Sequence, residues 1–259
     1  MRKAIALAAV LALPAAVLAD PGAVDWGKKV VKCTGSGAGN LRDADGNVAV
    51  ARIGAEKAAK LDALRNCMEA LKGVQLESGK SVGSALESDK GLTGRVEGLV
   101  RGFRVVGKPR YFSDGGVELD VEVPLEGKLS DALLPKGDAV PASAPSGAPA
   151  PGTALVVDAR GQKVTPALAP RVLDESGNEV YGPAMLSETG RKAGGGAAYA
   201  KDLESAQKTL ADRLGDKPVV VKAVKVAGSD VVISSADAAS LSGKNLGFLA
   251  DAHVVILAD

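Results

Sequence analysis

Residues 48–71, VAVARIGAEKAAKLDALRNCMEAL, predict one long helix, around which the neighbouring segments can be arranged. Its large apolar side chains recur at helical spacing, and we assign them to one buried arc: Val50, Ile53, Leu61, Leu64, Met68 and Leu71. Charged side chains occupy the opposite arc, which we expect to face solvent: Arg52, Glu56, Asp62, Arg65 and Glu69. This pattern is typical of a helix that lies on a sheet, with Gly73 as its stop signal.

The segments on either side of this helix supply the strands of the sheet. A strand is predicted over 28–34, and a glycine-rich turn follows it over 35–40. A polar segment, 77–94, leads to strands over 98–106 and 117–124, which a glycine-containing turn joins into an antiparallel hairpin. Val and Leu alternate with Glu and Asp along the second of these strands, which indicates one buried and one exposed face.

A change of composition divides the chain after this hairpin. Residues 135–153, PKGDAVPASAPSGAPAPGT, hold five prolines and three glycines and offer little to bury. We interpret them as a Pro/Gly/Ala-rich linker between two domains, 20–134 and 154–259. The first domain has the order strand, helix, strand, strand.

The second domain is also predicted to mix strands and helices. Leu203, Ala206, Leu210 and Leu214 lie at helical spacing, and Ser234 followed by Asp237 resembles a helix start. Strands are expected over 154–159, 171–174, 179–181, 219–226, 231–234 and 253–257. The predicted fold class is therefore α+β: two small mixed domains, each an antiparallel or mixed sheet packed by one or two helices.

The first nineteen residues predict export. Arg2 and Lys3 precede an apolar run over 4–13, and small side chains lead to a cleavage position before Asp20. The alternative, a membrane anchor that stays attached, is disfavoured because the apolar run is about half the roughly 20 residues that span a bilayer. We expect 1–19 to be a signal peptide, and the mature chain to be periplasmic or secreted and to contain no transmembrane segment.

Composition argues against nucleic acid as a partner. The chain has 32 basic and 31 acidic residues, so it offers no excess of positive charge for phosphates. Aromatic residues make up only 3%, which leaves few rings on which bases could stack. We therefore expect protein partners in the envelope, self-association among them.

Two cysteines, Cys33 and Cys67, connect a predicted strand and the predicted helix. In an oxidising compartment they can close a disulfide, and the alternative is a pair of buried thiols that never meet. The single histidine, His253, lies in an apolar strand, where a structural role is the commoner one. One histidine and two distant cysteines do not supply a zinc site, so we predict no metal site.

Three glycine- or carboxylate-containing segments resemble ligand motifs without matching them. Residues 73–81 have five residues between their glycines, where a phosphate loop has four, and Asn40 stands where the dinucleotide fingerprint has its third glycine. The cluster Asp43, Asp45 and Asn47 resembles a calcium loop, but Gly54 would stand at the position of the bidentate glutamate. We predict no catalytic residues and no cofactor, and hence a protein that is not an enzyme.

Three runs within 28–125 resemble a known family. They are KKVVKCTGSGAGN at 28–40, ARIGAEKAAKLDALRNCMEALKGVQLESG at 51–79, and GRVEGLVRGFRVVGKPRYFSDGGVELDVEVPL at 94–125. They are similar to the twenty-kilodalton bacterial lipoprotein family and to the related N-terminal domain of the flagellar T-ring assembly protein. The second half, with ALVVDARG, RVLDESGNEVYG and DVVISSADA, is similar to the partner domain of longer members.

The resemblance implies envelope proteins without a known catalytic centre, several of which assemble into rings around the flagellar motor. Many members carry a lipidated cysteine, whereas this chain has Asp20 at that position. We therefore expect an exported envelope protein with a structural or assembly role, associated with the outer membrane or the flagellum, that acts through protein contacts at unpaired sheet edges. The alternative is a periplasmic binding module that holds a small ligand or an envelope polymer between its domains.

Overall fold

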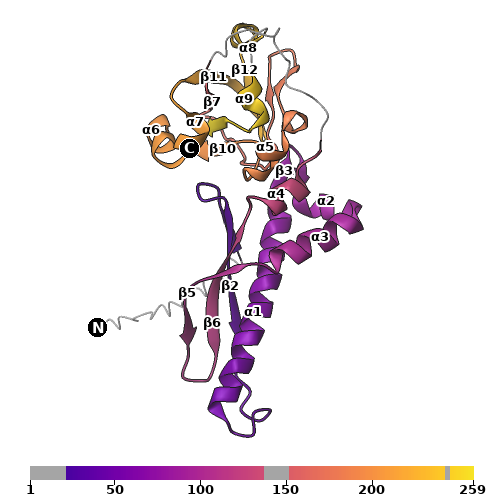
Figure 1. The fold of residues 1–259 in the computed structure, drawn as a ribbon, viewed down its shortest axis with the longest axis vertical. Helices are drawn as coiled ribbons and strands as arrows, with labels where there is room; N and C mark the ends of the chain where they lie inside the picture. The colour runs from indigo at the N-terminus through magenta and orange to yellow at the C-terminus, as the bar shows by residue number, and fades with distance from the viewer. Residues whose placement is uncertain (1–21, 137–151, 243–245) are drawn as a thin grey trace, which may run out of the picture.

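The computed structural model describes residues 22–136, 152–242 and 246–259. The predicted signal peptide and most of the predicted linker lie outside these residues, so the division into two domains stays a prediction. Two sheets lie at opposite ends of the molecule, each with its own helices (Figure 1). The α+β class expected from the sequence is confirmed.

The first sheet has four antiparallel strands in the order β1-β2-β6-β5, and the longest helix lies along one of its faces (Figure 1). Its outer face carries alternating polar side chains, including ion pairs from Arg104 to Glu122 and from Arg110 to Asp120 and Glu118. The elements of this part are β1 (Gly22–Asp25), β2 (Val30–Gly37), α1 (Val48–Gly73), β3 (Gln75–Glu77), β4 (Lys80–Ser81), α2 (Val82–Ser88), α3 (Lys90–Val100), β5 (Arg104–Tyr111), β6 (Val117–Pro124) and α4 (Lys128–Leu133).

The predicted orientation of α1 is wrong along its first four turns. The helix buries a ridge of mostly small side chains at every fourth position: Ala51, Ala55, Ala59, Ala63, Cys67 and Leu71. Val50, Ile53 and Leu61, which we assigned to the core, are 49%, 55% and 66% exposed. Leu64 and Met68 are only partly buried against the core.

Glycines in β2 explain this orientation. Gly35 and Gly37 belong to the strand, not to the turn predicted there, and they lie directly against the α1 backbone. A Cβ added at Gly35 would lie 2.2 Å from the carbonyl oxygen of Ala59, and one at Gly37 would lie 2.1 Å from that of Ala55. Small side chains on both surfaces therefore let the helix approach the sheet more closely than a ridge of Val, Ile and Leu would allow.

The segment after α1 is helical, where the sequence indicated a polar loop and the start of a strand. Ser81 caps α2 by accepting from the Ser84 backbone N–H at 3.2 Å, and Asp89 caps α3 through Leu92 at 3.0 Å. Helix α3 continues to Val100, so the strand predicted from 98 begins only at Arg104. The cap residues stabilise two short helices that apolar periodicity alone did not indicate.

The second sheet has seven strands in the order β10-β13-β7-β11-β12-β8-β9, of which the first four run parallel. Its central strands are buried on both faces, since alternate residues of β7 belong to two different hydrophobic clusters. Its elements are β7 (Ala154–Asp158), β8 (Val172–Leu173), β9 (Glu179–Tyr181), a 3-10 helix (Pro183–Met185), α5 (Glu188–Lys192), β10 (Ala198–Ala200), α6 (Leu203–Thr209), α7 (Ala211–Leu214), β11 (Pro218–Ala227), β12 (Asp230–Ile233), α8 (Ser235–Leu241), α9 (Gly247–Ala250) and β13 (Val254–Leu257).

The two parts are joined by more than the linker. Gln75 forms a parallel bridge with Ala167, and its carbonyl accepts from the Leu168 backbone N–H at 2.9 Å. The Trp26 ring meets the edge of Tyr199 at a centroid distance of 5.5 Å. One hydrophobic cluster contains side chains from both parts. The two sheets therefore share a packed junction, although the proline-rich composition of 135–153 suggested looser attachment.

Candidate interaction surface

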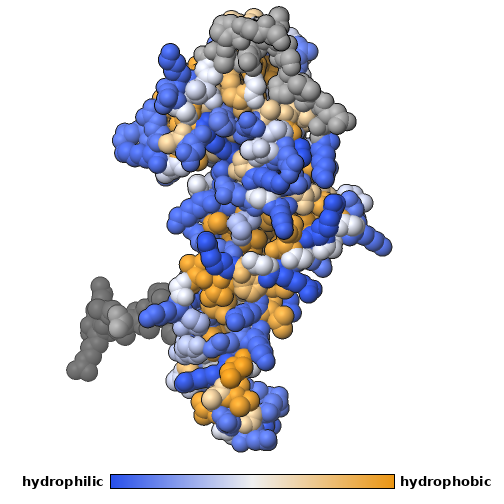
Figure 2. Space-filling model, in the orientation of Figure 1, coloured by the Kyte–Doolittle hydropathy of each residue, from blue (hydrophilic) through white to orange (hydrophobic). Residues whose placement is uncertain are grey.

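A row of apolar side chains runs along the solvent side of α1. We call Val50, Ile53, Leu61 and Leu64 the α1 stripe; they are spaced three, eight and three residues apart, so they share one side of the helix. Because the alanine ridge packs on the sheet, the stripe points away from it. Apolar side chains break up the charged surface over this lower part of the molecule (Figure 2). Three exposed large apolar residues on one helix side form a patch of the kind that marks interaction sites.

The stripe widens into a groove between α1 and the end of α3. Two adjoining hollows of about 390 and 280 Å³ share Leu61 and Leu64. Phe103 and Met68 complete the apolar floor, one in each hollow. We call these two hollows together the α1 groove. Its floor is apolar and its walls are charged, which is the usual composition of a peptide-binding groove.

Cations dominate the wider hollow of the α1 groove. Lys57, Lys60 and Arg101 line it, and within the residues that the structure describes none of the three pairs with a carboxylate. Glu69 and Glu97 line only the narrower hollow, and Glu69 is already paired with Lys72 at 2.7 Å. The wider end of the groove therefore presents apolar surface inside a ring of unpaired positive charge.

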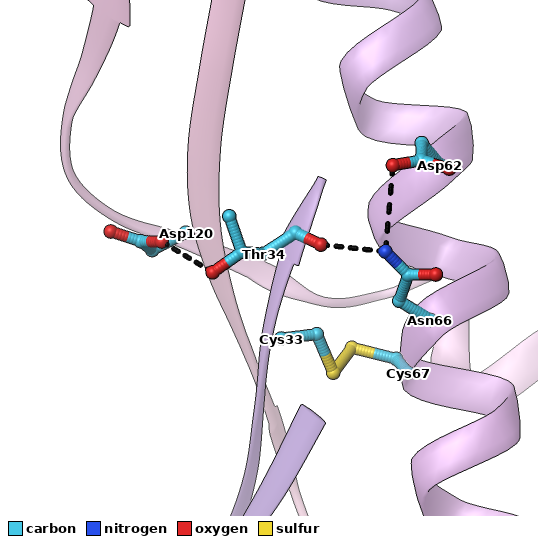
Figure 3. Close-up of a disulfide and its surroundings, with 6 residues drawn as sticks. All are labelled: Cys33, Thr34, Asp62, Asn66, Cys67 and Asp120. Carbon is cyan, nitrogen blue, oxygen red and sulfur yellow. Dashed lines mark hydrogen bonds between the residues drawn. A yellow bond between two sulfur atoms is a disulfide. The ribbon is translucent and has the colours of Figure 1, made fainter. Parts of the chain in front are cut away.

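A disulfide fixes α1 to the sheet. Cys33 of β2 and Cys67 of α1 are bonded, with 5.5 Å between their Cα atoms, and both are buried (Figure 3). Of the two arrangements that the sequence left open for these cysteines, the structure has the disulfide and not a pair of separate buried thiols. The bond holds the helix with its alanine ridge on the sheet, which keeps the α1 stripe on the outside.

Strand β1 pairs only with the first half of β2, and helix α1 covers the edge of the remaining half. Asn66 donates its Nδ2 to the Thr34 carbonyl oxygen at 2.8 Å, and Asp62 accepts from the Ser36 backbone N–H at 3.0 Å (Figure 3). These side chains satisfy backbone groups that an added strand would otherwise use. Asp62, which was expected to face solvent, thus has a structural role.

The opposite edge strand, β5, offers a poor surface for strand addition. Its register with β6 shifts between Val106 and Arg110, where Gly107 has a φ of 73° and Pro109 lacks an N–H. Bulges, prolines and charged side chains are the devices with which proteins block edge pairing. The pKa of Asp120 is lowered by its hydrogen bond to Arg110, so this ion pair is kept near neutral pH. The α1 groove is therefore a better contact site than β5 or the end of β2 that β1 leaves uncovered.

A second candidate site lies at the junction of the two parts. A hollow of about 400 Å³ is lined by Lys29, Arg213 and His253, together with the carboxylates of Glu126, Asp212 and Asp251. Lys29 donates to the carbonyl oxygen of Ala193 at 2.7 Å, and Arg213 donates to the same oxygen at 2.6 Å. Burial, followed by the charge of Arg213, lowers the pKa of Lys29.

Arg213 is only 7% exposed, and its Nη1 has no hydrogen-bond partner in the described part of the chain. The sequence did not identify Lys29 or Arg213 as site residues. They are far apart in the chain, and only the folded structure places both on the Ala193 carbonyl oxygen. The ring Nδ1 of His253 lies 3.2 Å from the Thr153 carbonyl oxygen.

The segments that resembled ligand motifs serve as structural elements. Asn47 caps α1 through its Oδ1, which accepts from the Ala49 and Val50 backbone N–H groups at 3.0 and 3.3 Å. Residues 73–81 form the end of α1 and the β3-β4 hairpin. Among 22–136, 152–242 and 246–259, no three metal-ligating side chains come together. No helix in the same ranges has both the length and the apolar character needed to cross a membrane.

Comparison with known protein families finds a similarity in the second half of the chain. A family model described as the second domain of Treponema pallidum Tp0624 matches residues 154–259, which include every strand of the seven-stranded sheet. No curated protein matches the chain. The second half is therefore similar to a domain of a bacterial protein, and that description names no activity.

Proposed function

We propose that this protein is an exported structural or assembly protein of the bacterial envelope, not an enzyme, and that it acts through protein contacts. The α1 stripe is the observation that carries the proposal, because a helix held on its sheet by a disulfide leaves its large apolar side chains to the outside. The export signal and the resemblance of 28–125 to envelope lipoproteins support the periplasmic address. The same resemblance suggests a flagellar setting.

Covering the stripe would contribute favourably to association. Val50, Ile53 and Leu61 each keep about half or more of their surface in water. Full burial of such a side chain yields roughly 1.5–3 kcal/mol, so covering the exposed halves contributes about 1 kcal/mol each.

In-cell crosslinking tests the proposal. A photo-activatable amino acid at Leu61 reports on the stripe, and the same amino acid at Lys208 on exposed α6 serves as the matched control. We expect a defined protein adduct from position 61 and none from position 208. A position 61 that yields only uncrosslinked monomer in intact cells would refute the proposal.

A second candidate function is a periplasmic binding module that uses the junction hollow. It is favoured by the packed junction and by the buried Arg213, whose Nη1 has no hydrogen-bond partner among the described residues. A panel of amino acids and sugars tests it, because a ligand raises the melting temperature by mass action. A ligand at this site should stabilise the wild type and lose its effect in Lys29→Gln; no stabilisation by any member counts against the module.

A further inference from the structure

We infer that the segment which occupies the α1 groove is an acidic amphipathic segment of another protein, with apolar side chains flanked by Asp or Glu. This inference rests on the proposed function and specifies the chemistry of the partner. The floor of the groove, formed by Leu61, Leu64 and Phe103, requires apolar side chains to fill it. A partner without apolar side chains would leave the floor of the groove exposed to water.

The walls of the groove determine the charge of the partner. Lys57, Lys60 and Arg101 have no carboxylate partner among the described residues, and any occupant of the groove removes water from around them. Desolvating an unpaired cation is costly, whereas pairing it with a carboxylate recovers that cost and steers the encounter. The partner should therefore carry carboxylates on both sides of its apolar row.

The same charges argue against a second copy of this chain in the groove. Two stripes packed face to face would bring Lys57 and Lys60 of one copy against the same lysines of the other. Like charges at close range cost free energy and disfavour that partner. On the sheet-facing flank of α1, Glu56 accepts from the Tyr111 hydroxyl at 2.6 Å and is already used within the chain.

An anionic bilayer is a poorer occupant than a protein segment. The groove is concave, and separate side chains can enter its two hollows, whereas a bilayer surface is flat on that scale. A peptide can place apolar and acidic groups where the hollows and the cations require them.

Two synthetic peptides test the inference with the full mature protein. Both are amphipathic helices of about 18 residues, roughly 27 Å long, with the same leucine row; one carries Glu and the other Lys at the polar positions. Fluorescence anisotropy should give at least about tenfold tighter binding of the Glu peptide, with the difference shrinking as salt rises. The double variant Lys57→Glu/Lys60→Glu should reverse the preference.

The matched control is Lys201→Glu/Lys208→Glu, which makes the same change of net charge on an exposed surface far along the chain and should keep the preference. Equal affinity for the two peptides, binding of neither, or a preference for phosphatidylglycerol vesicles that the groove variant abolishes would each overturn the inference. If position 61 still crosslinks to a protein in cells, the proposed function stands and only the acidic chemistry of the partner fails.

Discussion

Gly35→Ala tests the packing that turns the α1 stripe outward. The added methyl group would lie 2.2 Å from the Ala59 carbonyl oxygen and 2.3 Å from the Ala63 backbone nitrogen. Both are backbone atoms of a helix that is bonded to the sheet through Cys67, so neither can move aside without shifting α1 as a whole. The substitution therefore overpacks the helix-sheet contact instead of filling a space.

The expected cost follows from the closeness of these contacts. Overpacking a well-packed core costs typically about 1–3 kcal/mol and occasionally more, and contacts this short with backbone belong at the upper end, about 3 kcal/mol. For a chain of this size, each kcal/mol corresponds to a shift of about 2–4 °C in melting temperature, so we expect a loss of roughly 6–12 °C.

Gly54→Ala is the matched control for this substitution. Gly54 lies in α1, and a Cβ there would meet nothing within 4 Å. Replacing a glycine by alanine within a helix stabilises by about 0.8–1 kcal/mol, so this variant should be more stable than wild type. Urea unfolding followed by circular dichroism, without reductant, measures both. If Gly35→Ala is as stable as wild type, or both substitutions shift stability in the same direction, the close contact of α1 with β2 is wrong.

Three further predictions concern the disulfide, the junction and the helix cap. Because Cys33 and Cys67 are separated by 34 positions, Cys33→Ala/Cys67→Ala should cost about 3–4 kcal/mol in urea unfolding; reductant should lower the stability of wild type and leave the double variant unchanged. The buried Lys29 has a pKa below its usual 10.5, so between the folded and unfolded pKa values the unfolded chain binds more protons, and stability should rise with pH. Relative to Lys29→Gln, wild type should therefore gain stability in urea titrations as the pH rises towards 10.5, and a constant difference would contradict this sign. Asn47→Ala removes the α1 cap and should cost about 1 kcal/mol, which thermal unfolding can measure; an unchanged midpoint would mean that the cap contributes nothing.

Strands β2 and β6 and the existence of α1 could be predicted because their signals are local. Strand β1 was not predicted, and β5 begins six residues later than expected. Val117, Leu119, Val121 and Val123 alternate with acidic residues, and all four are buried in β6. Such alternation identifies a half-buried strand whatever packs against it. The cap of α8 is also local, and Ser234 accepts from the Asp237 backbone N–H at 3.0 Å as the sequence indicated.

The buried side of α1 could not be predicted from its own residues. The helix has two sides that could be buried, one of large apolar side chains and one of alanines, and hydrophobicity favours the first. The choice depends on Gly35 and Gly37, which are adjacent to the helix only in the folded protein. If these glycines are assigned to a strand, the alanines at every fourth position of α1 indicate which side of the helix is buried.

The junction between the two parts could not be predicted from the sequence either. A proline-rich segment says how the chain is connected, but not whether the connected parts touch. The bridge between Gln75 and Ala167 and the convergence of Lys29 and Arg213 on one carbonyl join residues nearly a hundred or more positions apart. No periodicity or motif encodes such pairs.

Hydroxyl-radical footprinting of Leu61 tests most directly the claim that the α1 stripe is a contact surface. Leu61 is 66% exposed in the isolated chain, whereas Leu71 on the same helix is 1% exposed and serves as the internal reference. We predict that Leu61 is oxidised rapidly in the purified protein and is protected in the intact envelope, while Leu71 is protected in both. Equal oxidation of Leu61 in the purified protein and in the envelope would contradict the account.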